Sequence, residues 1–232
     1  MTLTPTEWTA LWLSLKVAGV AIVIALPFAI WIAWILSRKH FFGKWLLEGV
    51  IHLPLVLPPV VVGYLLLLMF GRDGWVGGCL RETFGISIAF TWVAAAIAAG
   101  VMGFPLMVRA IRLAFDAVDT GIENAARTLG ASKRRTFFTI ALPLAVPGVV
   151  AGTILGFARA LGEFGATIAF AANIPGETRT LPLAIYTALQ APDGENIAFR
   201  LAVISAVVAL IAVALSEWLS ARSRRQLTGR DS

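Results

Sequence analysis

Cysteine, histidine and charged residues are scarce in this sequence of 232 residues, and each shortage excludes a class of protein. Cys79 is the only cysteine, so the chain has no internal disulfide and no cysteine pair for a metal site. The two histidines, His40 and His52, offer little material for a convergent catalytic site. The nucleotide loop G-x-x-x-x-G-K-[ST] does not occur. We therefore predict no catalytic residue, metal ligand or bound cofactor in this chain.

Apolar residues dominate what is present. They make up 59% of the sequence against 14% charged residues, with a mean hydropathy of +0.85, which is unlike a soluble domain. Apolar stretches that could cross a bilayer, at about 20 residues each, lie at residues 17–36, 49–70, 86–108 and 136–158, with a shorter one at 201–216. The sequence predicts an all-α polytopic membrane helix bundle, a single domain over residues 1–232 with about five transmembrane helices.

Two other features complete this topology. The apolar stretch 164–176 is too short to cross, so we expect a re-entrant or surface segment that lines protein or water. Basic residues gather at 38–44, 109–135 and 222–230, and such clusters favour the cytoplasm. We therefore expect the N-terminus outside and the C-terminus in the cytoplasm. This topology and anionic lipid explain the net charge of +6, so no nucleic-acid partner is expected.

A polar segment, residues 116–135, connects the third and fourth predicted spans on the cytoplasmic side. Thr120 followed by Glu123 fits a capping box at a helix start. Gly130 is placed to end that helix in the left-handed conformation, and Ser132 to cap the next one. The segment is therefore predicted to form a short helix, a glycine corner and a second helix.

One face of the short helix is apolar and mostly small. Ile122, Ala125, Ala126 and Leu129 follow the i, i+3, i+4, i+7 spacing of a helical stripe. Such a helix can lie on the membrane surface, with its basic neighbours at the headgroups. Alternatively, its small residues can let another protein approach closely. The pattern alone fits both.

Residues around this helix match a known motif: Ala125-Ala126, Gly130, Ile140 and Leu142-Pro143. The segment resembles the EAA loop of ABC-importer permeases, which docks into a cleft on the ATP-hydrolysing subunit. The family's glutamate would align with Asn124, whereas this chain has Glu123 one position earlier. Three more stretches, HLPLVLPPVVVGYLLL (52–67), FPLMVRAIR (104–112) and FARALGEFGATIAFAANIPGETRTLP (157–182), resemble permeases of the molybdate/sulfate group.

The resemblance implies the permease subunit of an ATP-driven molybdate importer in a bacterial inner membrane. Its partners would be a second copy of this chain, two cytoplasmic subunits that bind the ATP, and a periplasmic oxyanion-binding protein. The implied coupling residues are Ile122, Glu123, Ala125, Ala126, Leu129 and Gly130. Sulfate, thiosulfate or tungstate remain alternative cargoes. An ion-coupled secondary transporter and a membrane enzyme are alternatives from other classes. The former usually shows repeated halves and intramembrane carboxylates, and this sequence has no apparent internal repeat and few such carboxylates.

The predicted spans carry features that suit a translocation path. Pro54, Pro58 and Pro59 interrupt the second span, and broken membrane helices commonly line protein or a cavity. We therefore place Pro58 and Pro59 at a possible path. Arg159 and Glu163, four residues apart at the outer end of the fourth span, can form either a gate or an ordinary ion pair along one helical face.

Several other residues carry structural expectations. Glycines recur every four residues at Gly148, Gly152 and Gly156, and small residues gather at 96–103, which suits close packing of helices. Lys16 is expected to snorkel outward from the start of the first span, and His52 to make a packing hydrogen bond.

Overall fold

The first residues of the chain determine how α1 (Pro5–Arg38) begins. The computed structural model describes residues 4–228. At the start of α1, the Thr4 hydroxyl accepts a hydrogen bond from the Glu7 amide (3.3 Å). The Glu7 carboxylate accepts one from the Thr4 amide (2.8 Å), which completes a capping box. α1 then runs for 34 residues through a largely apolar sequence and ends at Lys39, where the backbone becomes extended.

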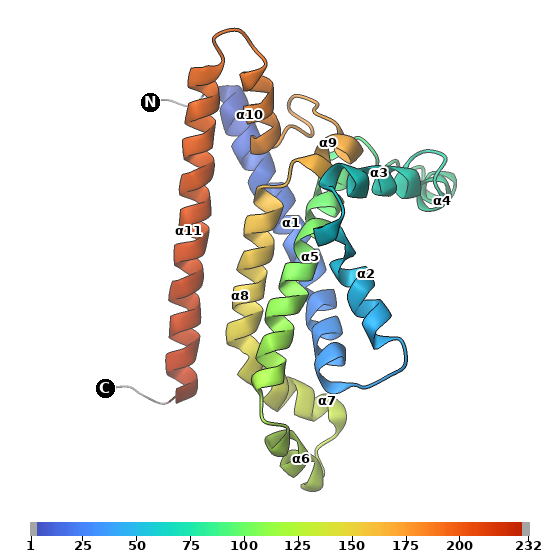
Figure 1. Ribbon diagram of the computed structural model, residues 1–232, viewed down its shortest axis with the longest axis vertical. Helices are drawn as coiled ribbons and strands as arrows, with labels where there is room; N and C mark the ends of the chain where they lie inside the picture. The colour runs from blue at the N-terminus through green and yellow to red at the C-terminus, as the bar shows by residue number, and fades with distance from the viewer. Residues whose placement is uncertain (1–3, 229–232) are drawn as a thin grey trace.

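Helices follow one another along the rest of the described chain, and no strand occurs between residues 4 and 228. They are α2 (Lys44–Val56), α3 (Pro59–Phe70), α4 (Trp75–Phe84), α5 (Trp92–Ala117), α6 (Thr120–Thr128), α7 (Lys133–Thr136), the π-helical turn η1 (Phe137–Ala141), α8 (Leu142–Leu161), α9 (Gly165–Ala171), α10 (Leu181–Leu189) and α11 (Glu195–Thr228). In Figure 1, α1, α5, α8 and α11 run along the long axis. α6 and α7 lie at one end of the bundle, and α9 and α10 lie near the other.

Within residues 4–228, four helical segments are long and apolar enough to cross a membrane: α1, α5, the continuous helix Lys133–Leu161 and the part Glu195–Leu215 of α11. A fifth span results if α2 and α3 are taken together, although they are bent by 114°. The helical membrane bundle predicted from the sequence is therefore confirmed, with four or five candidate spans. The basic cluster predicted at 222–230 ends outside the described residues.

Some predicted boundaries were wrong. The third span was expected from residue 86, but α5 begins at Trp92, and residues 86–91 carry no helix. That stretch is as apolar as the span, so hydropathy does not separate the two. The glycine-containing segment before it forms α4, a helix that was not predicted from the sequence. The fourth and fifth predicted spans lie within longer helices, because helices continue past the hydrocarbon into the interface.

The bend between α2 and α3 follows from its prolines. Pro59 is the first residue of α3, where its missing amide proton costs nothing, and Pro58 precedes it with extended backbone. α3 therefore turns across the bundle and packs against α9 (Figure 1). Gly63 allows this contact, because a Cβ at Gly63 would collide with the Ala166 carbonyl oxygen. The predicted interruption of the second span is confirmed.

The core lies where α5 packs between α1 and α8. A Cβ added to Gly152 would lie 2.9 Å from Ile111 Cγ1, and one on Gly148 would collide with the Ala114 side chain. Of the predicted small face at 96–103, Gly103 meets the glycines of α8, because its added Cβ would lie 3.0 Å from the Gly156 carbonyl oxygen. These contacts bring the helix backbones close together. α9 is buried at Ala166, Phe170 and neighbouring residues, so the first part of the stretch 164–176 lines protein, as expected for a short non-spanning segment, whereas residues 175 and 176 are exposed.

Candidate coupling segment and distal cavity

The candidate coupling segment is α6 with the corner that follows it, residues 119–132. Its start differs from the predicted capping box, because Asp119 is the N-cap residue and its Oδ1 accepts a hydrogen bond from the Gly121 amide (2.7 Å). Thr120 is already the first helical residue. Aspartate is as effective at an N-cap as threonine, and Glu123 has a stronger partner elsewhere. The predicted cap at Thr120 was therefore wrong.

Glu123 binds Arg38, the last residue of α1. Its Oε1 lies 2.8 Å from Arg38 Nη2 and accepts a second hydrogen bond from Arg38 Nε at 3.0 Å. Arg38 Nη2 also donates to the Val118 carbonyl oxygen at 3.1 Å. The two side chains are 13% and 15% exposed, so solvent screens this ion pair only in part. The contact fixes α6 to the end of α1.

The end of α6 is a left-handed corner, as predicted. Gly130 has φ of +93°, a conformation that side chains with a Cβ rarely adopt. The Gly130 amide donates to the Arg127 carbonyl oxygen (3.0 Å), and the Ala131 amide donates to that of Ala126 (3.0 Å). These two bonds form a Schellman motif. Ser132 then caps α7 by accepting from the Arg135 amide (3.3 Å), which confirms the predicted second cap.

The apolar face of α6 is uncovered in the described chain. Leu129 is 89% exposed and Ile122 48% exposed, while Ala125 is exposed and Ala126 half-buried. No residue of α6 is buried. Large apolar side chains therefore project from the end of the bundle with small residues between them, a surface that suits a lipid interface or a protein cleft.

The residues proposed for a path or gate lie at the other end. Pro59 packs against α9, because a Cβ on Gly165 would lie 2.8 Å from Pro59 Cβ, while Pro58 is exposed. Arg159 Nη1 lies 2.6 Å from Glu163 Oε2, and the Glu163 side chain is almost fully buried. Glu163 Oε1 also accepts from the Ala166 amide (2.8 Å), which ties the end of α8 to the start of α9. The pair along one helical face is therefore present, and a gating role stays a prediction.

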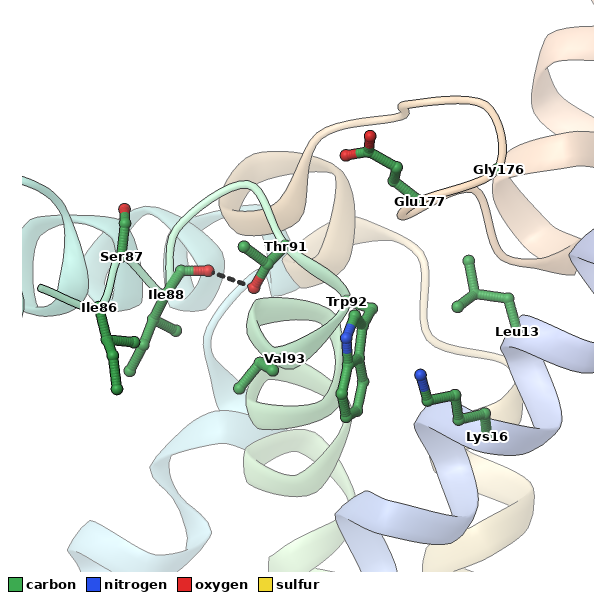
Figure 2. Close-up of a pocket in the computed structure, with 10 residues that line it drawn as sticks. All are labelled: Leu13, Lys16, Ile86, Ser87, Ile88, Thr91, Trp92, Val93, Gly176 and Glu177. Carbon is green, nitrogen blue, oxygen red and sulfur yellow. Dashed lines mark hydrogen bonds between the residues drawn. The ribbon is translucent and has the colours of Figure 1, made fainter.

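A cavity of about 430 Å³, here called the distal cavity, lies at the end of the bundle opposite α6. Figure 2 shows its lining: Leu13, Lys16, Ile86, Ser87, Ile88, Thr91, Trp92, Val93, Gly176 and Glu177. The Lys16 ammonium nitrogen lies 3.7 Å from the centre of the Trp92 ring. The Trp92 ring on α5 is therefore the neighbour of the Lys16 ammonium group, and the outward snorkelling of Lys16 stays a prediction.

The contact of Arg38 with Glu123 and that of Trp92 with Lys16 were not predicted from the sequence. Each pair joins residues far apart in the chain, and no local pattern reports such contacts. His52 behaves as expected, with Nδ1 lying 2.8 Å from the Glu48 carbonyl oxygen. Among the described residues no group of three or more metal-ligating side chains occurs.

Comparisons with known proteins agree with this architecture. The family described as "Binding-protein-dependent transport system inner membrane component" matches residues 25–225. The molybdenum transport system permease protein ModB of Escherichia coli K12 is 59% identical over 230 residues, which cover 99% of this chain and all of that protein. The protein of the same name from Haemophilus influenzae is 54% identical, over 95% of this chain and 96% of its own. A bacterial ABC transporter involved in alginate import has a similar fold, with a TM-score of 0.75 at 18% identity, covering 95% of this chain and 80% of its own.

Proposed function

The chain belongs to the family of binding-protein-dependent transport system inner membrane components, and from this membership we propose that it carries molybdate. It is a multi-pass inner-membrane permease subunit of an ABC importer, and such permeases are not the catalytic subunits. The observation that carries the cargo assignment is the similarity over the whole length of a molybdenum transport permease. A permease contacts its cargo only transiently, so the binding protein contributes most of the selectivity.

The proposed complex contains two copies of this chain, two ATP-binding subunits and a periplasmic oxyanion-binding protein. The N-terminus lies outside and the C-terminus in the cytoplasm, which places α6 on the cytoplasmic side. ATP is bound by the partner subunits, and this chain holds no cofactor. Sulfate or thiosulfate is the alternative cargo, and tungstate closely resembles molybdate in shape and charge.

α6 is proposed to dock into a cleft on the ATP-binding subunit. The exposure of Leu129 and Ile122 supports this, as does the small surface of Ala125 and Ala126 between them. The Schellman corner at Gly130 fixes the angle between α6 and the helix that continues into α8. Movement of a docked α6 is therefore passed to α8 by a rigid connection.

Alternating access follows from this arrangement as a shift between populations. ATP binds more tightly when the two ATPase subunits are closed, so it favours the permease conformation compatible with closure. The ion pair between Arg38 and Glu123 makes α1 move with α6. The bundle then opens toward one side of the membrane at a time, without any chemistry in this chain.

The docking proposal is tested with Ala126→Glu, which adds a charge to the middle of the proposed contact. Thr128→Glu is the matched control, because it adds the same charge at an exposed position off the apolar face of α6. We expect Ala126→Glu to weaken retention of the ATPase subunit about tenfold or more, equivalent to at least ~1.4 kcal/mol, while Thr128→Glu retains it. If Ala126→Glu keeps the subunit and couples normally, α6 is a membrane-surface helix.

The cargo proposal is tested by reconstituting the purified complex with its binding protein in proteoliposomes. We expect ATP-dependent uptake of labelled molybdate that ionophores leave unchanged, and little uptake of sulfate. Sulfate uptake without molybdate uptake would move the assignment to the alternative cargo. Uptake that stops when an ion gradient is removed and does not depend on ATP would contradict the importer mechanism.

A further inference from the structure

Lys16 is a positive charge within α1 that has no carboxylate partner among the described residues. Two other basic side chains of the distal half pair with carboxylates: Arg159 lies 2.6 Å from Glu163, and Arg200 lies 2.6 Å from Glu7. Lys16 instead faces the Trp92 ring at 3.7 Å. An indole holds an ammonium ion in place but does not neutralise its charge. The charge of Lys16 therefore remains available to an anion.

This charge borders the distal cavity. Figure 2 shows the Lys16 side chain entering from α1, with Trp92 beside it at the start of α5. Thr91 is the N-cap residue of α5, so the positive end of a helix of 26 residues meets the same cavity. The field of that helix end adds to that of the ammonium ion.

Glu177 is the acidic residue of the lining. Figure 2 shows its carboxylate pointing away from Lys16, and Glu177 is exposed. The two side chains therefore do not pair in this structure. A carboxylate at the rim repels an anion in the cavity, which keeps binding weak and favours release.

We propose that the distal cavity is a transient binding site for a tetrahedral oxyanion, with Lys16 as its direct contact and Trp92 as the positioning residue for Lys16. Water takes up roughly 30 Å³ per molecule, so a cavity of about 430 Å³ holds an oxyanion with part of its hydration shell. Weak, hydrated binding suits a conduit, because an ion that binds tightly does not leave. The identity of this oxyanion as cargo rests on the proposed function.

The test uses the reactivity of lysine amines in the intact complex. The chain has four lysines, Lys16, Lys39, Lys44 and Lys133, so peptide mass spectrometry follows each one separately after a short treatment with an amine-acylating reagent. Labelling is compared in molybdate and in sodium chloride at equal ionic strength. At tenfold the dissociation constant, about a tenth of the sites remain free, so labelling of Lys16 should slow roughly tenfold. The other three lysines are internal controls and should not change.

Two versions of the labelling experiment distinguish a free oxyanion from the phosphate group of a lipid. One uses molybdate with the complex in nanodiscs of zwitterionic lipid, and the other uses anionic lipid without molybdate. Protection of Lys16 by free molybdate supports the proposal. Protection by anionic lipid alone assigns the site to a lipid phosphate and overturns it. Equal slowing at all four lysines, or no slowing at Lys16, also overturns it.

Variants add a second readout. Glu177→Gln should lower the molybdate concentration that half-protects Lys16, because it removes the opposing charge. Lys16→Gln should reduce molybdate uptake, whereas Lys16→Arg, which keeps the positive charge, should retain most of it. Arg72→Gln is the control, because Arg72 is an exposed cation that does not line this cavity. Uptake by the unaltered complex is measured in parallel. Normal uptake without protection refutes the Lys16 site alone, whereas absent molybdate uptake refutes the cargo assignment.

Discussion

The ion pair between Arg38 and Glu123 gives the sharpest test of how α6 moves the bundle. Glu123→Gln removes the charge but keeps the shape of the side chain. The pair is mostly shielded from solvent, with nitrogen to oxygen distances of 2.8 and 3.0 Å. Breaking an exposed ion pair costs about 0.2–1 kcal/mol, and breaking a fully buried one costs about 3–5 kcal/mol. The Arg38–Glu123 pair lies between these cases, so we expect its loss to weaken the attachment of α6 by about 2 kcal/mol.

A loss of about 2 kcal/mol lowers the ratio of attached to detached α6 by roughly 30-fold. The variant should still bind the ATPase subunit, because the exposed face of α6 is unchanged. Movement of α6 would no longer reach α1 efficiently, so the amount of molybdate transported per ATP hydrolysed should fall. Both quantities are measured in the same proteoliposomes, with and without the binding protein.

A double-mutant cycle with Arg38→Gln isolates the interaction itself. Because each single change already breaks the pair, the double variant should be little worse than either, with a coupling energy of about 1–2 kcal/mol. Glu48→Gln is the matched control, because Glu48 pairs with Arg112 at 2.8 Å between α2 and α5 without touching α6. Fully additive effects, or an unchanged transport ratio in Glu123→Gln, would refute the proposed role of the pair.

Three further outcomes are expected. Gly130→Val should disrupt the left-handed corner at a cost of at least ~1 kcal/mol and reduce retention of the ATPase subunit. Gly130→Asn should retain the subunit, because asparagine tolerates the left-handed conformation, and equal retention of the subunit by both variants would contradict this. Gly152→Leu should lower the melting temperature of the purified chain, because it overpacks the contact between α5 and α8 at a cost of about 1–3 kcal/mol. Gly19→Leu is the control, because nothing lies within 4 Å of its added Cβ. Indistinguishable melting curves of the two variants would contradict close packing at Gly152. A topology reporter after Ser232 should behave as cytoplasmic and one within residues 176–192 as external, and both on one side would refute the proposed orientation.

Local chemistry allowed the end of α6 to be predicted from sequence. A glycine in the left-handed region and a serine before a new helix act through neighbouring backbone atoms, so Gly130 and Ser132 behave as their types indicate. The start of α6 was one residue off, because Asp119 and Thr120 are both competent caps and only the actual backbone geometry selects one. Local signals of equal strength leave such a choice open.

Contacts between distant residues were not predictable in this way. Arg38 and Glu123 are 85 positions apart, and Lys16 meets Trp92 across two helices. Hydropathy placed Lys16 at a membrane boundary but gave no information on which neighbour its ammonium ion would meet. The bend after Val56 was expected from its prolines, whereas its angle of 114° depends on how α3 packs against α9.

The packing of the bundle explains how a small contact at one end can affect the other. α6 continues from α5 on one side and leads through α7 and η1 into α8 on the other. α5 and α8 meet through glycines with no space for a side chain, and the ion pair at Arg38 adds α1 to the same unit. Closely packed helices move together, because sliding them would require new side-chain positions throughout the contact. The distal cavity lies between α1, the start of α5 and the loop carrying Glu177, so displacement of this unit relative to that loop changes the distance between Lys16 and Glu177. We therefore expect a movement imposed on α6 to alter the charge around an anion in the proposed distal site, and a conduit driven from its opposite end requires such a response.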